Sequence, residues 1–163
     1  MRPGSRLATS LSCAVVGAGV AVLGSTTTWY RTIAPGRDIT SSAGTIHVSG
    51  AVKTYSPGDL GSALPPIAII SLVLAVLAFL VGPRARAALL SIVIAGEIAV
   101  IALGLALRFR VLVEAGSKIE GGAGRALVLT GGIVAIAAGV AALPLARTVR
   151  RVGMPETGPK EGE

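Results

Sequence analysis

Four long apolar blocks alternate with polar segments along the 163-residue chain. Each block holds about twenty residues, and at about 1.5 Å per residue a helix of that length crosses the roughly 30 Å hydrocarbon core of a membrane. The pattern therefore predicts an all-α membrane protein with four transmembrane helices in one domain, residues 1–146. The expected helices cover about residues 7–28, 65–82, 87–107 and 126–146, the outer loops cover 29–64 and 108–125, and a basic and then disordered cytoplasmic tail covers 147–163.

The first block follows a short basic head that carries Arg2 and Arg6, as in a signal peptide. The block is longer than the apolar part of a usual signal peptide and ends without a small-residue cleavage pattern. We therefore expect a retained helix that also acts as a signal-anchor. Trp29 and Tyr30 come directly after it. Aromatic residues at this place are typical of the boundary between membrane and water, which predicts that both anchor the helix end there.

The first polar segment, residues 29–64, contains a short strand pattern. Ile46, His47 and Val48 alternate apolar and polar side chains, and Ser49–Gly50 interrupts the alternation. We expect a small β-hairpin over the outer face of the membrane. Because isolated hairpins are marginally stable, it must pack on the helix ends or pair with the other outer loop. His47 has no Cys or second His as a metal co-ligand, so we expect a solvated loop residue.

Turn signals set the boundaries around the second block. Residues 57–60, Pro-Gly-Asp-Leu, predict a turn and a helix entry, with the prolines at 65–66 in the first helical turn, where a missing N–H is tolerated. The Gly-Pro pair at 82–83 ends the helix. The short basic connection through Arg84 and Arg86 makes the second and third spans antiparallel neighbours.

The second outer loop, residues 108–125, leaves one question open. Residues 111–113 are compatible either with an extension of the third helix or with a short strand over the outer face. The glycine-rich stretch at 121–124 is not followed by the Lys and Ser/Thr of a phosphate-binding loop, so we expect no phosphate site there.

Composition favours a membrane protein and argues against a nucleic-acid-binding one. The chain is 52% hydrophobic and only 14% charged, whereas soluble domains have about 25% charged residues. Its net charge of +7 comes from basic residues beside the apolar blocks, so the expected partners are anionic lipid headgroups and not nucleic acid. Lys and Arg are denser in the short inner segments, which predicts a plasma-membrane location with both termini in the cytoplasm.

Small residues at four-residue spacing predict how the helices pack, because membrane helices associate through small side chains. We expect the third and fourth spans to meet along two such stripes. We also expect glycines in the first block to admit a close neighbour. The stripes are Ala87, Ser91, Ala95 and Ala99 in the third span and Gly131, Ala135 and Gly139 in the fourth, and the glycines are Gly17, Gly19 and Gly24.

Glu97 is the candidate functional residue, because it is the one charge in the apolar block 87–107. Inserting a central acid costs roughly 2.5–3.5 kcal/mol, whereas each Leu, Ile or Val returns roughly 0.3–0.6 kcal/mol. The block has eleven such residues and therefore inserts. Glu97 lies two residues from Ala95 and Ala99, or about 200° around the helix, so it points away from their stripe. It faces either spans one and two, or lipid or another subunit.

Two interpretations of Glu97 stay open. As a functional residue it binds a proton or cation, or contacts a partner. As a structural residue it is held neutral by desolvation and bonds to a backbone carbonyl, to Ser71 or to Ser12. No second acid, His, Lys or Arg lies at the same depth to complete a proton relay.

Three short features stand in a familiar order: Trp29 after the first span, Gly58–Asp59–Leu60 with Leu64–Pro65 before the second, and Arg84-x-Arg86 before the third. In this order the chain resembles the actinobacterial Trp-associated conserved membrane protein family, whose genes tend to lie beside tryptophan-biosynthesis genes. The resemblance covers about residues 22–107. It implies a bacterial four-span protein of uncharacterised role.

The sequence offers no nucleophile–base pair, metal cluster or phosphate loop, so we expect neither an enzyme nor a cofactor. The first hypothesis is a non-catalytic accessory or assembly subunit that binds other membrane components, either another membrane protein or a second copy of itself. The alternative is a small proton- or cation-coupled transporter with Glu97 as the coupling acid. The four-span multidrug family that such a transporter resembles carries its glutamate in the first span and has very short loops. Here Glu97 lies in the third expected span, and the first outer loop covers residues 29–64.

Overall fold

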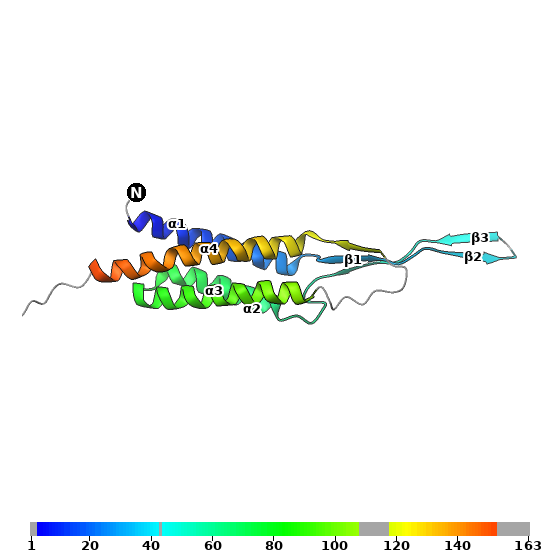
Figure 1. Ribbon diagram of the computed structural model, residues 1–163. Helices are drawn as coiled ribbons and strands as arrows, with labels where there is room; N and C mark the ends of the chain where they lie inside the picture. Colours follow the sequence, from blue (N-terminus) through cyan, green and yellow to red (C-terminus); the bar gives the residue numbers. More distant parts are fainter. Residues whose placement is uncertain (1–2, 43, 108–117, 153–163) are drawn as a thin grey trace, which may run out of the picture.

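The computed structural model describes residues 3–42, 44–107 and 118–152 of the chain. Four helices lie side by side in a bundle: α1 (Pro3–Thr26), α2 (Leu64–Leu80), α3 (Pro83–Ala106) and α4 (Ala123–Val152) (Figure 1). Apolar stretches of α1, α3 and α4 are long enough to cross a membrane. The fourth helix, α2, is shorter, with 17 residues. The mostly helical architecture expected from the apolar blocks is thus confirmed for the described residues.

The link between α2 and α3 is tighter than the sequence suggested. α2 ends at Leu80 and α3 begins at Pro83, so Arg84 and Arg86 lie in the first turn of α3 and not in a connecting loop. Proline at the first helical position explains the early start, because its fixed φ suits a helix and its missing N–H has no partner there. The two helices pack against each other as antiparallel neighbours, as expected.

Arg86 completes this corner. Its Nε donates a hydrogen bond of 2.8 Å to the carbonyl of Ala78, and one guanidinium nitrogen donates a bond of 2.9 Å to the carbonyl of Val81. The last carbonyls of a helix have no partner within the helix. The guanidinium therefore caps the C-terminal end of α2 from the neighbouring helix.

α4 continues past the point where the fourth span was expected to end. Pro144 lies inside the helix, which runs to Val152 and includes the basic residues at 147–151. A proline removes one backbone hydrogen bond, a loss that membrane helices tolerate when neighbouring groups compensate. The apolar part of the helix still ends at Ala146. The expected disorder of residues 154–163, and the open question at 111–113, lie outside the described residues.

A small sheet lies at one end of the bundle. Its strands are β1 (Tyr30–Ile33), β4 (Val52–Tyr55) and β5 (Lys118–Gly121), in the antiparallel order β4-β1-β5. Tyr30 is opposite Tyr55 on one side and Gly121 on the other. The two polar loops therefore pair with each other, which is the support that a hairpin in the first loop was expected to need.

A second pair of strands extends this sheet away from the helices. β2 (Arg37–Ser41) and β3 (Gly44–Val48) form an antiparallel pair, the distal hairpin, with Ile39 opposite Ile46. Together with β1 and β4 it makes a long two-stranded ribbon, residues 30–55, that projects beyond the bundle (Figure 1). The expected interruption at Ser49–Gly50 is present, because neither residue belongs to a strand. The strands themselves are more extensive than the sequence suggested.

The expected turn at residues 57–60 leads into α2. Ser56 donates two hydrogen bonds to Oδ2 of Asp59, 2.8 Å from its backbone nitrogen and 2.7 Å from its hydroxyl. These bonds lower the pKa of the exposed Asp59 carboxyl below its usual value of 3.8. Gly61 then adopts a φ of 63°, a conformation that glycine takes without strain.

Candidate functional site

Helix packing decides where Glu97 points, and it differs from the expected arrangement. The closest backbone approach involves α1 and α4. A Cβ at Gly17 would lie 2.7 Å from the carbonyl oxygen of Gly131, and a Cβ at Gly24 would lie 2.7 Å from that of Gly124. The expectation for glycines of the first block is thus confirmed at Gly17 and Gly24. Nothing lies within 4 Å of a Cβ at Gly19.

The third and fourth spans do pack against each other, as expected, but not through the predicted small-residue stripes. Ser91 and Ala95 are exposed on the outside of the bundle, and Ala87 and Ala99 are only partly covered. In α4, Gly131 and Ala135 face α1, and only Gly139 lies against α3, where its neighbour is Ile94. Other residues of α3 fill the bundle interior instead. Lipid is as apolar as leucine, so hydrophobicity does not force either the small or the large side chains of a membrane helix to face protein. The buried residues of α3 are Leu90, Val93, Glu97, Val100 and Gly104.

Glu97 therefore lies inside the bundle and is 0% exposed. One carboxylate oxygen, Oε2, lies 3.4 Å from where a Cβ of Gly132 would be, so the acid lies against α4 at this glycine. Neither carboxylate oxygen has a hydrogen-bond partner among the described residues. The expected bonds to Ser71 or Ser12 are absent there: Ser71 is buried against Gly96, and Ser12 is exposed.

The sequence predicts that Trp29 and Tyr30 anchor the helix end in the membrane interface, but the structure buries both side chains inside the protein. Trp29 is 0% exposed and packs with Leu64, Val100 and Val128. Its indole Nε1 donates a hydrogen bond of 2.7 Å to the carbonyl of Gly24. Tyr30 is 8% exposed, and its hydroxyl has no partner among the described residues. The ring of Trp29 fills the space between the helix ends under the sheet, so it faces protein on every side.

The distal hairpin has two chemically different faces. Side chains alternate between the faces of a strand pair, so the register of β2 and β3 separates them. Ile39, Ile46 and Val48 lie on one face together with Arg37, and we call this the apolar face. Its aliphatic side chains are 57%, 66% and 46% exposed, respectively.

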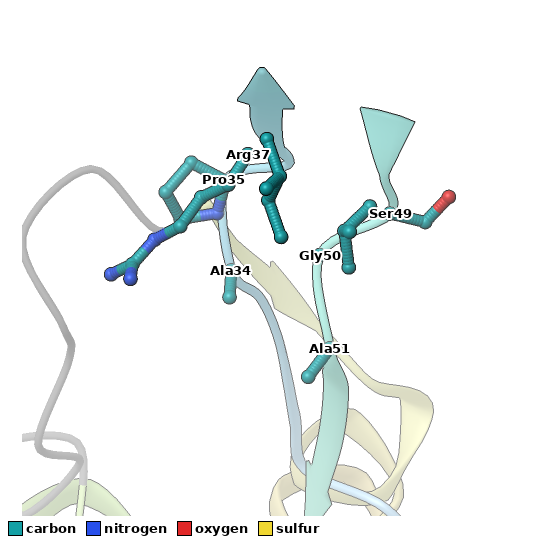
Figure 2. Close-up of a pocket in the computed structure, with 8 residues that line it drawn as sticks. Ala34, Pro35, Arg37, Ser49, Gly50 and Ala51 are labelled. Atoms are coloured by element: carbon teal, nitrogen blue, oxygen red, sulfur yellow. The ribbon is translucent and has the colours of Figure 1, made fainter. Parts of the chain in front are cut away.

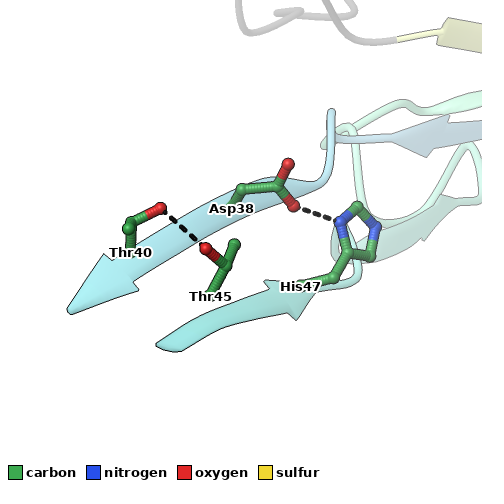
Figure 3. Close-up of polar contacts among 4 residues, drawn as sticks. All are labelled: Asp38, Thr40, Thr45 and His47. Atoms are coloured by element: carbon green, nitrogen blue, oxygen red, sulfur yellow. Dashed lines mark hydrogen bonds and ion pairs between the residues drawn. The ribbon is translucent and has the colours of Figure 1, made fainter. Parts of the chain in front are cut away.

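The opposite, polar face of the distal hairpin is held by cross-strand contacts. Asp38 pairs with Nδ1 of His47, and the hydroxyls of Thr40 and Thr45 are 3.2 Å apart (Figure 3). His47 is 70% exposed, as expected of a solvated residue, but it lies in strand β3 and not in a loop. Its neighbour is the Asp38 carboxylate on the opposite strand, a pairing that the sequence pattern does not predict. Ion pairs at such exposed positions contribute little to stability.

A cavity of about 580 Å³ lies where the distal hairpin meets the sheet of β4, β1 and β5, which we call the proximal sheet (Figure 2). Ala34, Pro35 and Arg37 line one side, and Ser49, Gly50 and Ala51 line the other. The two segments of the ribbon come close here, because the backbone nitrogen of Ala34 donates a 3.0 Å hydrogen bond to the carbonyl of Ala51. Ile39 and Val48 also border the cavity, so it continues onto the apolar face.

Comparison with protein-family models and with curated proteins finds no match to this chain. Function therefore has to be argued from two features: an enclosed carboxyl at the centre of the bundle, and a ribbon whose distal hairpin has an uncovered apolar face. The sequence pointed to Glu97 by its charge alone. It contained a signal for the apolar face too, in the alternation of Ile46, His47 and Val48, but Ile39 joins this face only once the register of β2 and β3 is known.

Proposed function

We propose that this chain is a non-catalytic accessory or assembly protein of a bacterial plasma membrane and that it holds another membrane component through its ribbon. The observation that carries the proposal is the distal hairpin, which projects beyond the helices (Figure 1). Its side chains Ile39, Ile46 and Val48 are all exposed. A hairpin of two strands is marginally stable in water, and an uncovered apolar face is typical of a contact site. A partner on this face supplies the missing packing.

In this proposal all four helices cross the membrane. The 17 residues of α2 measure about 26 Å at 1.5 Å per residue, and a small mismatch with the bilayer is accommodated at modest cost. Four spans put the start of α1 and the end of α4 on one side. The density of arginine there supports the cytoplasmic side, beside anionic headgroups, with the ribbon outside the cell. The resemblance to the Trp-associated membrane family agrees with this arrangement and stays a prediction.

Co-purification tests the proposal. The tagged chain is extracted from its own membranes in mild detergent, beside a variant in which an Asn-Gly turn replaces residues 35–50 and joins β1 directly to β4. This shortened ribbon keeps the proximal sheet and the bundle. We expect a partner in stoichiometric amount with the full chain and none with the shortened one, while both elute as folded protein. Equal recovery with both forms, or no partner with either, contradicts the proposal.

A small proton- or cation-coupled transporter is the second candidate, and Glu97 supports it. An enclosed acid whose oxygens have no protein partner among the described residues is typical of a proton or cation site in a membrane protein. The test compares the native chain with Glu97→Gln in sealed vesicles, recording proton, sodium and potassium flux under an imposed gradient. The transporter hypothesis requires a flux that the substitution abolishes. The same passive leak in both forms contradicts it.

A further inference from the structure

The apolar face of the distal hairpin combines three exposed aliphatic side chains with the guanidinium of Arg37. We propose that Ile39, Ile46 and Val48 dock onto the extramembrane surface of another protein that is apolar at its centre and carries an Asp or Glu opposite Arg37. This inference rests on the proposed accessory function. It adds which face of the ribbon makes the contact and what kind of surface receives it.

The positive charge of the ribbon favours an acidic partner. Residues 30–55 contain Arg31, Arg37 and Lys53 but one acid, Asp38. Asp38 already pairs with His47 on the polar face. The guanidinium of Arg37 makes no ion pair or hydrogen bond within the described part of the chain, and Arg37 lies on the apolar face opposite Val48. A carboxylate on the partner completes this unpaired guanidinium, and Arg–carboxylate pairs are both strong and geometrically specific.

The position of the distal hairpin argues against lipid as the occupant. The ribbon continues the direction of the bundle away from its end (Figure 1). From Ile33 to Ile39 the chain advances about 20 Å at 3.3 Å per residue. With the helices across the bilayer, the apolar face therefore lies in the aqueous phase. A protein surface is the occupant that can reach it there.

Area and charge argue against a second copy of this chain. Three aliphatic side chains cover far less than the roughly 800 Å² per partner that a stable interface buries. Two apolar faces placed against each other would also bring two copies of Arg37 together, and like charges across an interface are costly. A different protein can enclose the hairpin in a groove and contact its edges and its cavity. It can therefore bury more of the hairpin surface than a second copy of this chain can.

Site-specific photocrosslinking tests the inference. The full chain, in its own membranes, carries benzoylphenylalanine at position 46 on the apolar face, or at position 45 on the polar face as the matched control. Both positions are exposed, so the probe is tolerated at each. We expect one adduct from position 46 and none from 45. Mass spectrometry of the adduct should place the crosslinked segment of the partner next to an Asp or Glu.

Charge reversal then tests the role of Arg37. Arg37→Glu should lower the adduct yield at least about tenfold, a loss typical of a buried charge pair. Replacing the partner's carboxylate with arginine should restore it. Lys53→Glu makes an equal change of net charge on the proximal sheet and is the control for long-range electrostatic steering. It should change the adduct yield by less than about twofold, because Lys53 does not lie on the apolar face.

Each other outcome has a definite meaning. An adduct of twice the 16.2 kDa chain mass overturns the inference in favour of a second copy. An adduct from position 45 instead of 46, or an Arg37→Glu variant with unchanged yield, also overturns it but leaves the accessory function in place. Co-purification that survives without any ribbon crosslink does the same. Loss of both co-purification and crosslinking removes the inference and the proposed function together.

Discussion

The backbone of Gly17 in α1 touches the backbone of Gly131 in α4. A Cβ at Gly17 would lie 2.7 Å from the Gly131 carbonyl oxygen and 2.6 Å from the backbone nitrogen of Ala135. The reverse also holds, since a Cβ at Gly131 would lie 2.6 Å from the carbonyl oxygen of Gly17. This contact joins the first and last helices of the chain, and weak Cα–H···O bonds are common where helices come this close.

The Gly17→Ala variant should therefore destabilise the bundle. An added methyl group has to push two helix backbones apart, and overpacking of this kind typically costs about 1–3 kcal/mol. Reversible unfolding in mixed detergent micelles measures the change. Gly19→Ala is the control, because nothing lies within 4 Å of its Cβ position, and it should be neutral or slightly stabilising. Equal stability of the two variants would contradict the close contact.

Trp29 should report a protein environment and not a lipid one. It is the one tryptophan in the chain and it is 0% exposed. Its fluorescence should therefore be quenched weakly by acrylamide in water and weakly by brominated lipid. Trp29→Ala should cost about 3–5 kcal/mol, as large core truncations do, and Trp29→Phe should cost less although it loses the bond to Gly24. Strong quenching by brominated lipid would show that the ring faces the membrane.

Removing the cap that Arg86 places on α2 should weaken the helix pair. Arg86→Met keeps the length of the side chain but loses both hydrogen bonds to the carbonyls of Ala78 and Val81, a loss of about 1–3 kcal/mol. Arg84→Met is the matched control. Arg84 is exposed and makes no such bond in the described part of the chain, so its loss should cost less than about 0.5 kcal/mol. The same unfolding assay compares them, and equal losses would argue against the cap.

Asp59 should make the turn before α2 sensitive to acid. Hydrogen bonds from Ser56 favour the charged carboxylate and place its folded pKa below the usual 3.8. Its stabilising contribution is therefore fully present above pH 3.8 and is lost as the pH falls through the lower folded pKa. A carbon-detected NMR titration of the Asp59 carboxyl measures the midpoint. Ser56→Ala should raise that midpoint toward 3.8, and a native midpoint at or above 3.8 would contradict the turn geometry.

Apolar block length predicted the helices well, because a membrane helix must satisfy its backbone and cover its span within one continuous segment. The break between α2 and α3 at Gly82 follows from the same local signals. Which side of α3 turns inward was not predictable in this way. Lipid is as apolar as leucine, so a stripe of alanines has no obligation to face protein. The neighbour of Glu97 in α4 is Gly132, thirty-five residues away along the chain.

Trp29 shows the same limit at the helix end. An aromatic residue after an apolar block reads alike in sequence whether its ring faces lipid or protein. What decides between them is the pair of glycines beside the ring: atoms of Trp29 lie 3.1 Å from a Cβ position at Gly104 and 2.5 Å from one at Gly124. The apolar face of the ribbon is a third case, since its composition is local but its register depends on pairing.

The pairing of β1 with β5 has a consequence for biogenesis. Thr32 and Ile119 are opposite each other in the sheet, yet three helices are made before Ile119 leaves the ribosome. Strand contacts between such distant segments form late, because a long loop must first be closed. The central strand β1 therefore has one edge unpaired until β5 has been synthesised. The ribbon acquires the support of β5 only then, so a partner that binds the supported ribbon would bind only chains that already contain β5.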